Sequence, residues 1–157
     1  SLESAKVGCP GSMRGISRLS YGPITRYMAC VDFHGLSIRC REVGELSVAL
    51  EHLAVLTTIK VGVRSSSMEC SFAERVRKVV PAVLIEHSTS SEELGMVLSS
   101  RFRIAVLGSI VNAPWCRDLE TALRIHEGLE PFRSRQKGRV RWRVRWTQLK
   151  NFDAEWQ

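Results

Sequence analysis

The sequence predicts an α/β protein, with α+β as the alternative class. We expect a mixed sheet that begins with an N-terminal hairpin, carries packed helices and ends in an Arg/Trp-alternating edge strand. Short period-two runs alternate along the chain with segments whose apolar residues recur at helical spacing. Short polar connections join them, and such alternation implies parallel or mixed strand pairing. The 157 residues, 44% apolar and 25% charged, suit one globular domain with tails.

The first elements expected are two strands, at residues 25–33 and 36–41. Between them, His34-Gly35 fits a tight two-residue turn. The second strand alternates Leu, Ile and Cys with Ser and Arg, which is typical of a half-exposed hairpin partner.

Two capping boxes predict helix starts further along the chain. Ser71-x-x-Glu74 and Ser90-x-x-Glu93 each place a hydroxyl three residues before a carboxylate. We expect Pro81 to end the helix that the first box opens, and Pro114 to lie in the first turn of a later one. The elements expected after the hairpin are a helix at 45–56, a strand at 59–63, a helix at 71–80, a strand at 82–86, a helix at 90–98, a strand at 102–107, a loop at 108–113, a helix at 114–129 and a strand at 139–146.

The predicted organisation is an arm at 1–23, one α/β domain at 24–150 and a tail at 151–157. The arm shows no apolar period, and the first 30 residues hold a single acid, Glu3. Acid-poor segments with Arg and Ser resemble organellar transit segments. A flexible basic arm, or non-native residues ahead of Met13, is the alternative.

The stretch 139–146 reads Arg-Val-Arg-Trp-Arg-Val-Arg-Trp. As a strand it places the arginines on one face, with Trp142 and Trp146 beside valines on the other. We assign the two tryptophans to a core or a protein interface rather than to base stacking. Edge protection against aggregation needs fewer charges than four in register. The pattern therefore favours an anionic partner, with a solvated edge, an acidic protein or a lipid surface as alternatives.

The excess of positive charge is confined to this region. Between Pro131 and Phe152 there are eight basic residues and no acid, whereas the rest of the chain holds 15 basic and 16 acidic residues. Arg outnumbers Lys 18 to 5, which suits bidentate phosphate contacts, although genomic base composition would give the same bias. An RNA or DNA phosphate backbone is the predicted partner. The residues expected to contact it are Arg133, Arg135, Lys137, Arg139, Arg141, Arg143, Arg145, Arg39 and Arg41.

No metal or cofactor is expected. The five cysteines are odd in number and form no Cys-x-x-Cys pair, and Cys30, His34 and Cys40 match no closed zinc site. Buried free thiols in a reducing intracellular compartment, such as a mitochondrial or other organellar matrix, are the simplest interpretation. No apolar run approaches the ~20 residues that span a bilayer, so no membrane contact is expected.

A catalytic alternative would use the ends of buried strands, near Glu86, His87, Gly108 and Cys116. The segment from Ala113 to Cys116, Ala-Pro-Trp-Cys, resembles the active-site turn of thioredoxin, which would imply an activated thiol at a helix start. The second cysteine of that turn is missing, since Arg-Asp-Leu follows. No residues are therefore assigned as catalytic.

The sequence thus predicts a non-catalytic RNA-binding subunit of a larger ribonucleoprotein, either ribosome-like or an RNA-processing assembly, with other protein subunits as neighbours. An enzyme that acts on nucleic acid and an architectural subunit that binds an acidic protein are the alternatives.

Overall fold

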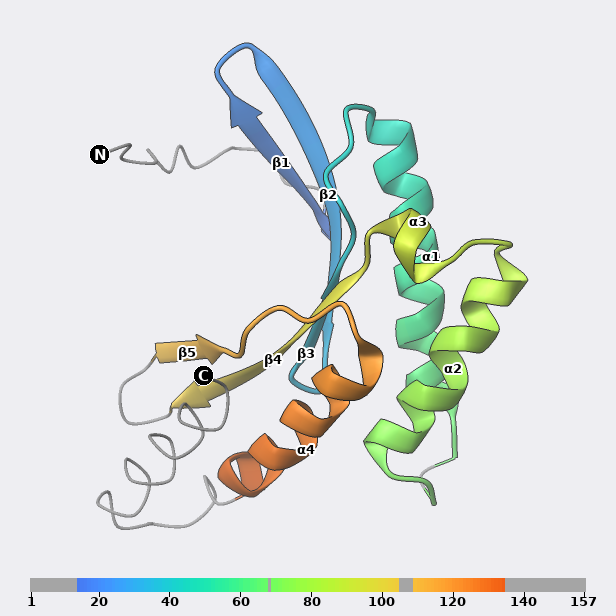
Figure 1. Cartoon of the computed structure of the whole chain (residues 1–157), viewed down its shortest axis with the longest axis vertical. Coiled ribbons are helices and arrows are strands. Elements are labelled where there is room, and N and C mark those ends of the chain that lie inside the picture. Colours follow the sequence, from blue (N-terminus) through green and yellow to red (C-terminus); the bar gives the residue numbers. More distant parts are fainter. Residues whose placement is uncertain (1–13, 68, 105–108, 135–157) are drawn as a thin grey trace.

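The protein is a curved antiparallel sheet with its helices on one side (Figure 1). The computed structural model describes residues 14–67, 69–104 and 109–134. The sheet has five strands in the order β1-β2-β3-β4-β5, and each neighbouring pair is antiparallel. The elements are β1 (Ile16–Tyr21), β2 (Ile24–Phe33), β3 (Leu36–Arg39), α1 (Leu46–Ser65), α2 (Phe72–Glu86), α3 (Ser91–Leu94), β4 (Val97–Ile104), β5 (Ser109–Asn112) and α4 (Leu119–Ser134).

The predicted α/β class, with helices packed on a sheet that opens with a hairpin, is confirmed. The parallel pairing expected between later strands is wrong for the part of the chain that the structure describes. Two of the segments expected to supply those strands, 59–63 and 82–86, are helical. The Arg/Trp strand at 139–146 lies outside the described residues.

The hairpin β2–β3 forms as predicted, and a second hairpin precedes it. His34 and Gly35 both have positive φ, 48° and 75°, as a two-residue turn of the primed type requires. Residues 16–21, expected to belong to an arm, form β1 instead and pair with β2. Burial of Ile16 opposite Ala29 anchors β1, and Gly22 turns the chain with a φ of 62°.

Helix α1 replaces a predicted helix and strand with one element of 20 residues. Ile59 and Val63 lie four residues apart on its buried face, so the five-residue alternation that suggested a strand also fits a helix. Gly62 allows α2 to approach closely, because a Cβ there would lie 2.8 Å from a methyl carbon of Val79. Among the described helices, α1 alone is long and apolar enough to cross a membrane, a test that the core helix of a soluble protein also passes.

Both capping boxes form, but the helices that follow them differ from the prediction. Ser71 and Glu74 cap α2 reciprocally, and the helix continues through Pro81 to Glu86. A proline inside a helix costs about 3 kcal/mol, and the burial of Val80 and Val83 on either side offsets this cost. The strand expected at 82–86 is therefore wrong.

The second box opens only one turn of helix, α3. Gly95 ends it in the left-handed conformation, with a φ of 57°, and β4 begins at Val97. The helix expected to reach residue 98 is therefore too long.

The last two described elements also start elsewhere than predicted. Residues 109–112, expected to be a loop, pair with β4 as strand β5. Helix α4 begins at Leu119 rather than near Pro114, and Asp118 accepts a hydrogen bond of 2.7 Å from the backbone N–H of Thr121 at its start.

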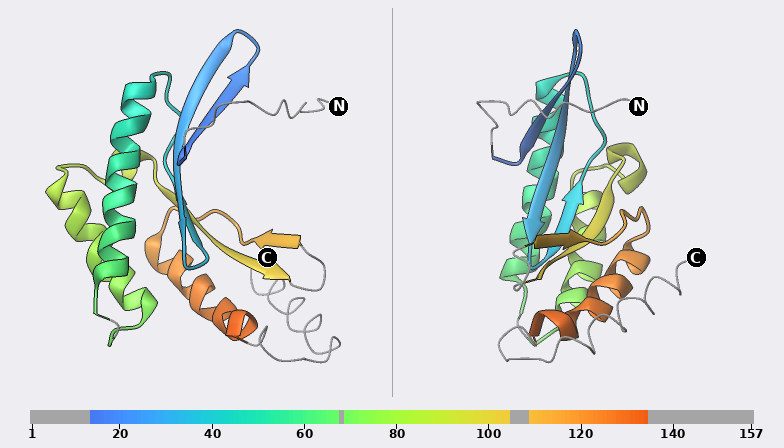
Figure 2. Two further views of the ribbon diagram at one scale, coloured as in Figure 1. Left: turned by 180° about the vertical axis from the view of Figure 1, so that it is seen from behind. Right: turned by 90° about the vertical axis from the view of Figure 1, so that its left-hand side faces the viewer.

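The core lies between the helices and one face of the sheet. Alternate residues of the central strands, among them Val31, Ile38 and Leu98, are buried towards α1, α2 and α4. These helices lie on the same side of the strands, and no described helix covers the opposite face (Figure 2). Side chains of the intervening positions, such as Cys30 and Arg39, point to that second face, because successive residues of a strand alternate.

Candidate nucleic-acid interface

Only part of the predicted binding surface falls within the described residues. Arg39 is the last residue of β3, Arg41 follows two positions later, and Arg133 belongs to the last turn of α4. The other predicted contacts, Arg135, Lys137, Arg139, Arg141, Arg143 and Arg145, lie outside the described residues.

Arg39 packs on the indole ring of Trp115. Its Cζ lies 3.9 Å from the ring centroid, a cation–π contact that contributes about 0.5–1 kcal/mol at an exposed site. The segment that carries Trp115 is held beside β4 by paired backbone hydrogen bonds of 2.8 Å between Leu98 and Cys116. Trp115 nevertheless remains 37% exposed. The stack is therefore fixed by the backbone and open to solvent.

Two further arginines follow the stacked residues by two positions in the sequence, Arg41 after Arg39 and Arg117 after Trp115. Arg41 and Arg117 line one cavity of about 350 Å³ together with Glu92. The Arg41 side chain packs closely against Gly95, because a Cβ added to Gly95 would lie 2.7 Å from the Cβ of Arg41. We call Arg39, Arg41, Trp115 and Arg117 the basic–aromatic patch.

A hydrogen-bonded network occupies the sheet face next to the patch. Arg101 contacts Asp32 at 3.2 Å and donates from Nε to Asn112 at 3.0 Å. The Ser37 hydroxyl also donates to Asp32. Arg101 and Asp32 thus neutralise each other and hold β2, β3 and β4 together.

A second basic feature lies where α1 passes the edge of β2. A groove of about 420 Å³ is lined by Arg14, Lys60 and Arg64, with Thr57 and Cys30 among its other walls. We call this the basic groove. Arg14 is far from the other two cations in the sequence. The interpretation of 59–63 as a strand hid the one available signal, the helical spacing of Lys60 and Arg64.

The floor of the basic groove depends on Gly15. This residue has a φ of 94°, and a Cβ on it would lie 2.7 Å from a methyl carbon of Leu53 on α1. Its carbonyl oxygen accepts a hydrogen bond of 2.8 Å from the N–H of Cys30. Glycine at this position therefore lets the chain lie directly on α1.

Glu86, His87 and Cys116, the described residues of the catalytic alternative, are not brought together at strand ends. Glu86 is the last residue of α2 and His87 is its C-cap, while Gly108 lies outside the described residues. Cys116 precedes α4 by three residues, and burial, followed by the charge of Asp118, raises the pKa of its thiol. The activated thiol implied by the thioredoxin-like turn is therefore contradicted.

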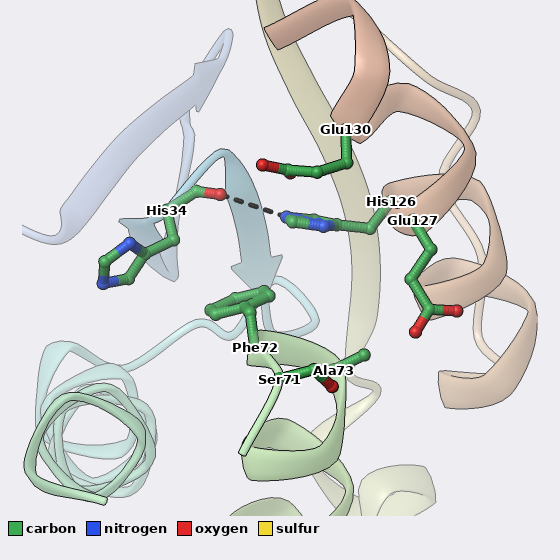
Figure 3. A pocket seen from close by; sticks show the side chains of 7 residues that line it. All are labelled: His34, Ser71, Phe72, Ala73, His126, Glu127 and Glu130. Carbon is green, nitrogen blue, oxygen red and sulfur yellow. Dashed lines mark hydrogen bonds between the residues drawn. The ribbon is translucent and has the colours of Figure 1, made fainter. Parts of the chain in front are cut away.

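A larger pocket of about 690 Å³ lies between the β2–β3 turn, α2 and α4 (Figure 3). His126 is buried there and donates from Nε2 to the carbonyl oxygen of His34 at 3.0 Å. Its ring stacks on Phe72 with centroids 4.6 Å apart. These contacts join α4 to the turn. Within the described ranges, no group of three or more His, Cys, Asp or Glu side chains could hold a metal ion.

Comparisons with protein-family models, with curated proteins and with solved structures find no match for this chain.

Proposed function

We propose that the protein is a non-catalytic RNA-binding protein that works as a subunit of a larger ribonucleoprotein. The observation that carries this proposal is the solvent-open stack of Arg39 on Trp115, with Arg41 and Arg117 two residues further along the same two segments and lining one cavity. An exposed aromatic ring next to guanidinium groups offers a base a stacking surface and offers its phosphate a counter-charge. An intracellular, reducing compartment, such as an organellar matrix, belongs to the same proposal.

The sequence supports the proposal independently. The eight basic residues between Pro131 and Phe152 supply the strong positive field that non-specific phosphate binding needs. That segment would contribute most of the affinity, whereas the basic–aromatic patch would hold unpaired bases. A single strand is the form of nucleic acid that offers both.

The test measures binding of a fluorescent single-stranded RNA to the full chain. Trp115→Leu removes the ring, and we expect it to weaken binding by about 1–3 kcal/mol, the usual contribution of one stacked base. Arg39→Lys keeps the charge but loses the planar group, so it should weaken binding by less than Arg39→Gln. Arg124→Gln, an exposed arginine on α4, is the charge-matched control for Arg39→Gln.

Equal binding by the native chain and Trp115→Leu, with both proteins folded by circular dichroism, would remove the patch from the proposal. Absence of RNA binding by the native chain would overturn the proposal itself.

A further inference from the structure

The three cations of the basic groove have no acidic partner in the part of the chain that the structure describes. Arg14 and Arg64 are exposed and Lys60 is half-buried, and none of the three forms an ion pair with another residue of the described ranges. Asp32, the acid that lines the groove, is engaged by Arg101 and Ser37. The groove therefore carries an excess of positive charge.

The helix geometry concentrates this charge. Lys60 and Arg64 are four residues apart on α1, so their side chains lie on the same face. Like charges at this spacing destabilise a helix, whereas a carboxylate at either position would stabilise it. A bound anion between the two side chains would remove this repulsion.

The basic groove adjoins the basic–aromatic patch across the sheet. Cys30, which lines the groove, is paired with Arg39 of β3, and Arg39 is in turn paired with Val97 of β4. Burial raises the pKa of the Cys30 thiol and Asp32 adds to this, while the nearby charges of Arg101 and Arg39 oppose it. Neighbouring strands are about 4.8 Å apart, so roughly 10 Å separates the groove edge from the strand beside Trp115.

We infer that the basic groove binds backbone phosphates of the same single-stranded nucleic acid whose base stacks at Trp115. This inference deepens the proposed function and rests on it. The strand would cross β4, β3 and β2 in turn, with a base at the patch and its neighbouring phosphates between Lys60, Arg64 and Arg14. Thr57 adds a hydroxyl donor on the same side of α1. The contacts would fix the path of the strand without selecting its sequence, because phosphates carry no base information.

The test compares two variants with equal loss of charge. Lys60→Gln/Arg64→Gln removes two groove cations, and Lys78→Gln/Arg124→Gln removes two exposed cations on α2 and α4. Affinity for a fluorescent oligouridylate is measured over a salt series. Each lost phosphate contact on a single strand lowers the slope of log affinity against log salt by about 0.7. We expect a decrease of about 1.4 for the groove variant and little change for the control.

The outcomes separate the groove from the proposed function. If the native chain binds RNA and the groove variant behaves like its control, the inference is overturned while the proposed function stands. If the native chain binds no RNA, titration with pyrophosphate decides whether the groove is a phosphate site. Binding that is lost in the groove variant keeps the groove as a phosphate site for a free ligand, and absence of binding overturns it.

Alkylation of the native cysteines gives a second readout. Cys30 lies in the groove, whereas Cys70 precedes α2, and both are partly exposed free thiols. Saturating oligouridylate should slow the reaction of Cys30 with N-ethylmaleimide several-fold and leave Cys70 unchanged, as peptide mass spectrometry would show. An unchanged rate at Cys30 would contradict a strand that lies in the groove.

Discussion

Positively charged side chains have two different surroundings in the described part of the protein. Where α2 meets α4, Arg77 contacts Glu120 at 3.0 Å and Glu127 at 3.7 Å, so its charge is neutralised within the fold. In the basic groove, Lys60 and Arg64 share a helix face with no acidic partner among the described residues. A helix-to-helix contact needs internal neutralisation, whereas a surface that binds an anion must keep its charge available. This difference is the one we expect if, as proposed, the groove binds an anionic partner.

The largest expected effect comes from the segment with the most concentrated charge. Changing Arg139, Arg141, Arg143 and Arg145 together to Gln should lower RNA affinity by orders of magnitude. The salt slope should fall by about 3, at about 0.7 for each phosphate contact. Fluorescence anisotropy across a salt series measures both quantities.

A quadruple variant that stays folded and binds like the native chain would refute the predicted contact of these four arginines with RNA phosphates. The proposed RNA contacts would then be limited to the basic groove and the basic–aromatic patch.

The second prediction compares one variant from each of the two regions, the α2–α4 contact and the basic groove. Arg77→Gln breaks an exposed ion-pair cluster and should lower the free energy of unfolding only slightly, because exposed ion pairs contribute little to stability, with RNA affinity nearly unchanged. Lys60→Gln/Arg64→Gln should do the opposite, leaving stability unchanged or slightly higher because like-charge repulsion is removed. Urea unfolding and RNA titration on the same samples check both. Equal loss of affinity in the two variants would mean that net charge alone matters.

Local signals made the hairpin and the helix caps predictable. His34-Gly35 reads as a turn because two adjacent positive φ values are required there, and the sequence offers residues that adopt them. Ser71 and Glu74 form a capping box because both partners lie within one turn. Such features need no knowledge of the rest of the fold.

The errors arose where packing between distant segments determines the local structure. The alternation from Ile59 to Val63 satisfies a strand and a helix equally, and burial of both residues against the core selects the helix. Pro81 stays within α2 because the valines around it pack on the core. The basic groove was missed for the same reason, because the strand predicted at 59–63 ended before Arg64, whereas the continuous helix α1 places Lys60 and Arg64 together along the groove. Arg14 joins them only through the path of β1 beside α1.

A separate effect, a loss of stability, is expected from a change in the floor of the basic groove. Gly15→Ala would place a Cβ 2.7 Å from Leu53 at a φ of 94°, which should cost about 1–3 kcal/mol in the free energy of unfolding. Gly44→Ala is the control, because a Cβ there meets no atom within 4 Å and its φ is not positive. Thermal unfolding followed by circular dichroism compares them. Equal melting temperatures would mean that the chain before β1 does not rest on α1 as described.

The smallest expected effect links the basic–aromatic patch to the core. Burial lowers the pKa of His52 on α1 below its usual 6.5, and the charge of Arg41 lowers it further. The neutral imidazole is thus favoured in the folded state, so its contribution to stability is complete above pH 6.5 and is lost as pH falls through the lowered pKa. Carboxylates with lowered pKa values, such as Glu74 and Asp118, stay ionised in this window.

Arg41→Gln should therefore raise the pKa of His52 towards its usual value, as a titration followed by NMR of the imidazole protons would show. Bound RNA phosphate at the patch should act in the same direction, because it neutralises the same charge. Arg77→Gln should leave the titration unchanged, since Arg77 is neutralised within the fold and contributes no charge at His52. If Arg41→Gln leaves the pKa of His52 unchanged, the charge of the patch has no effect on the titration of α1. His52 would then report burial alone, and the patch and the core would be electrostatically independent.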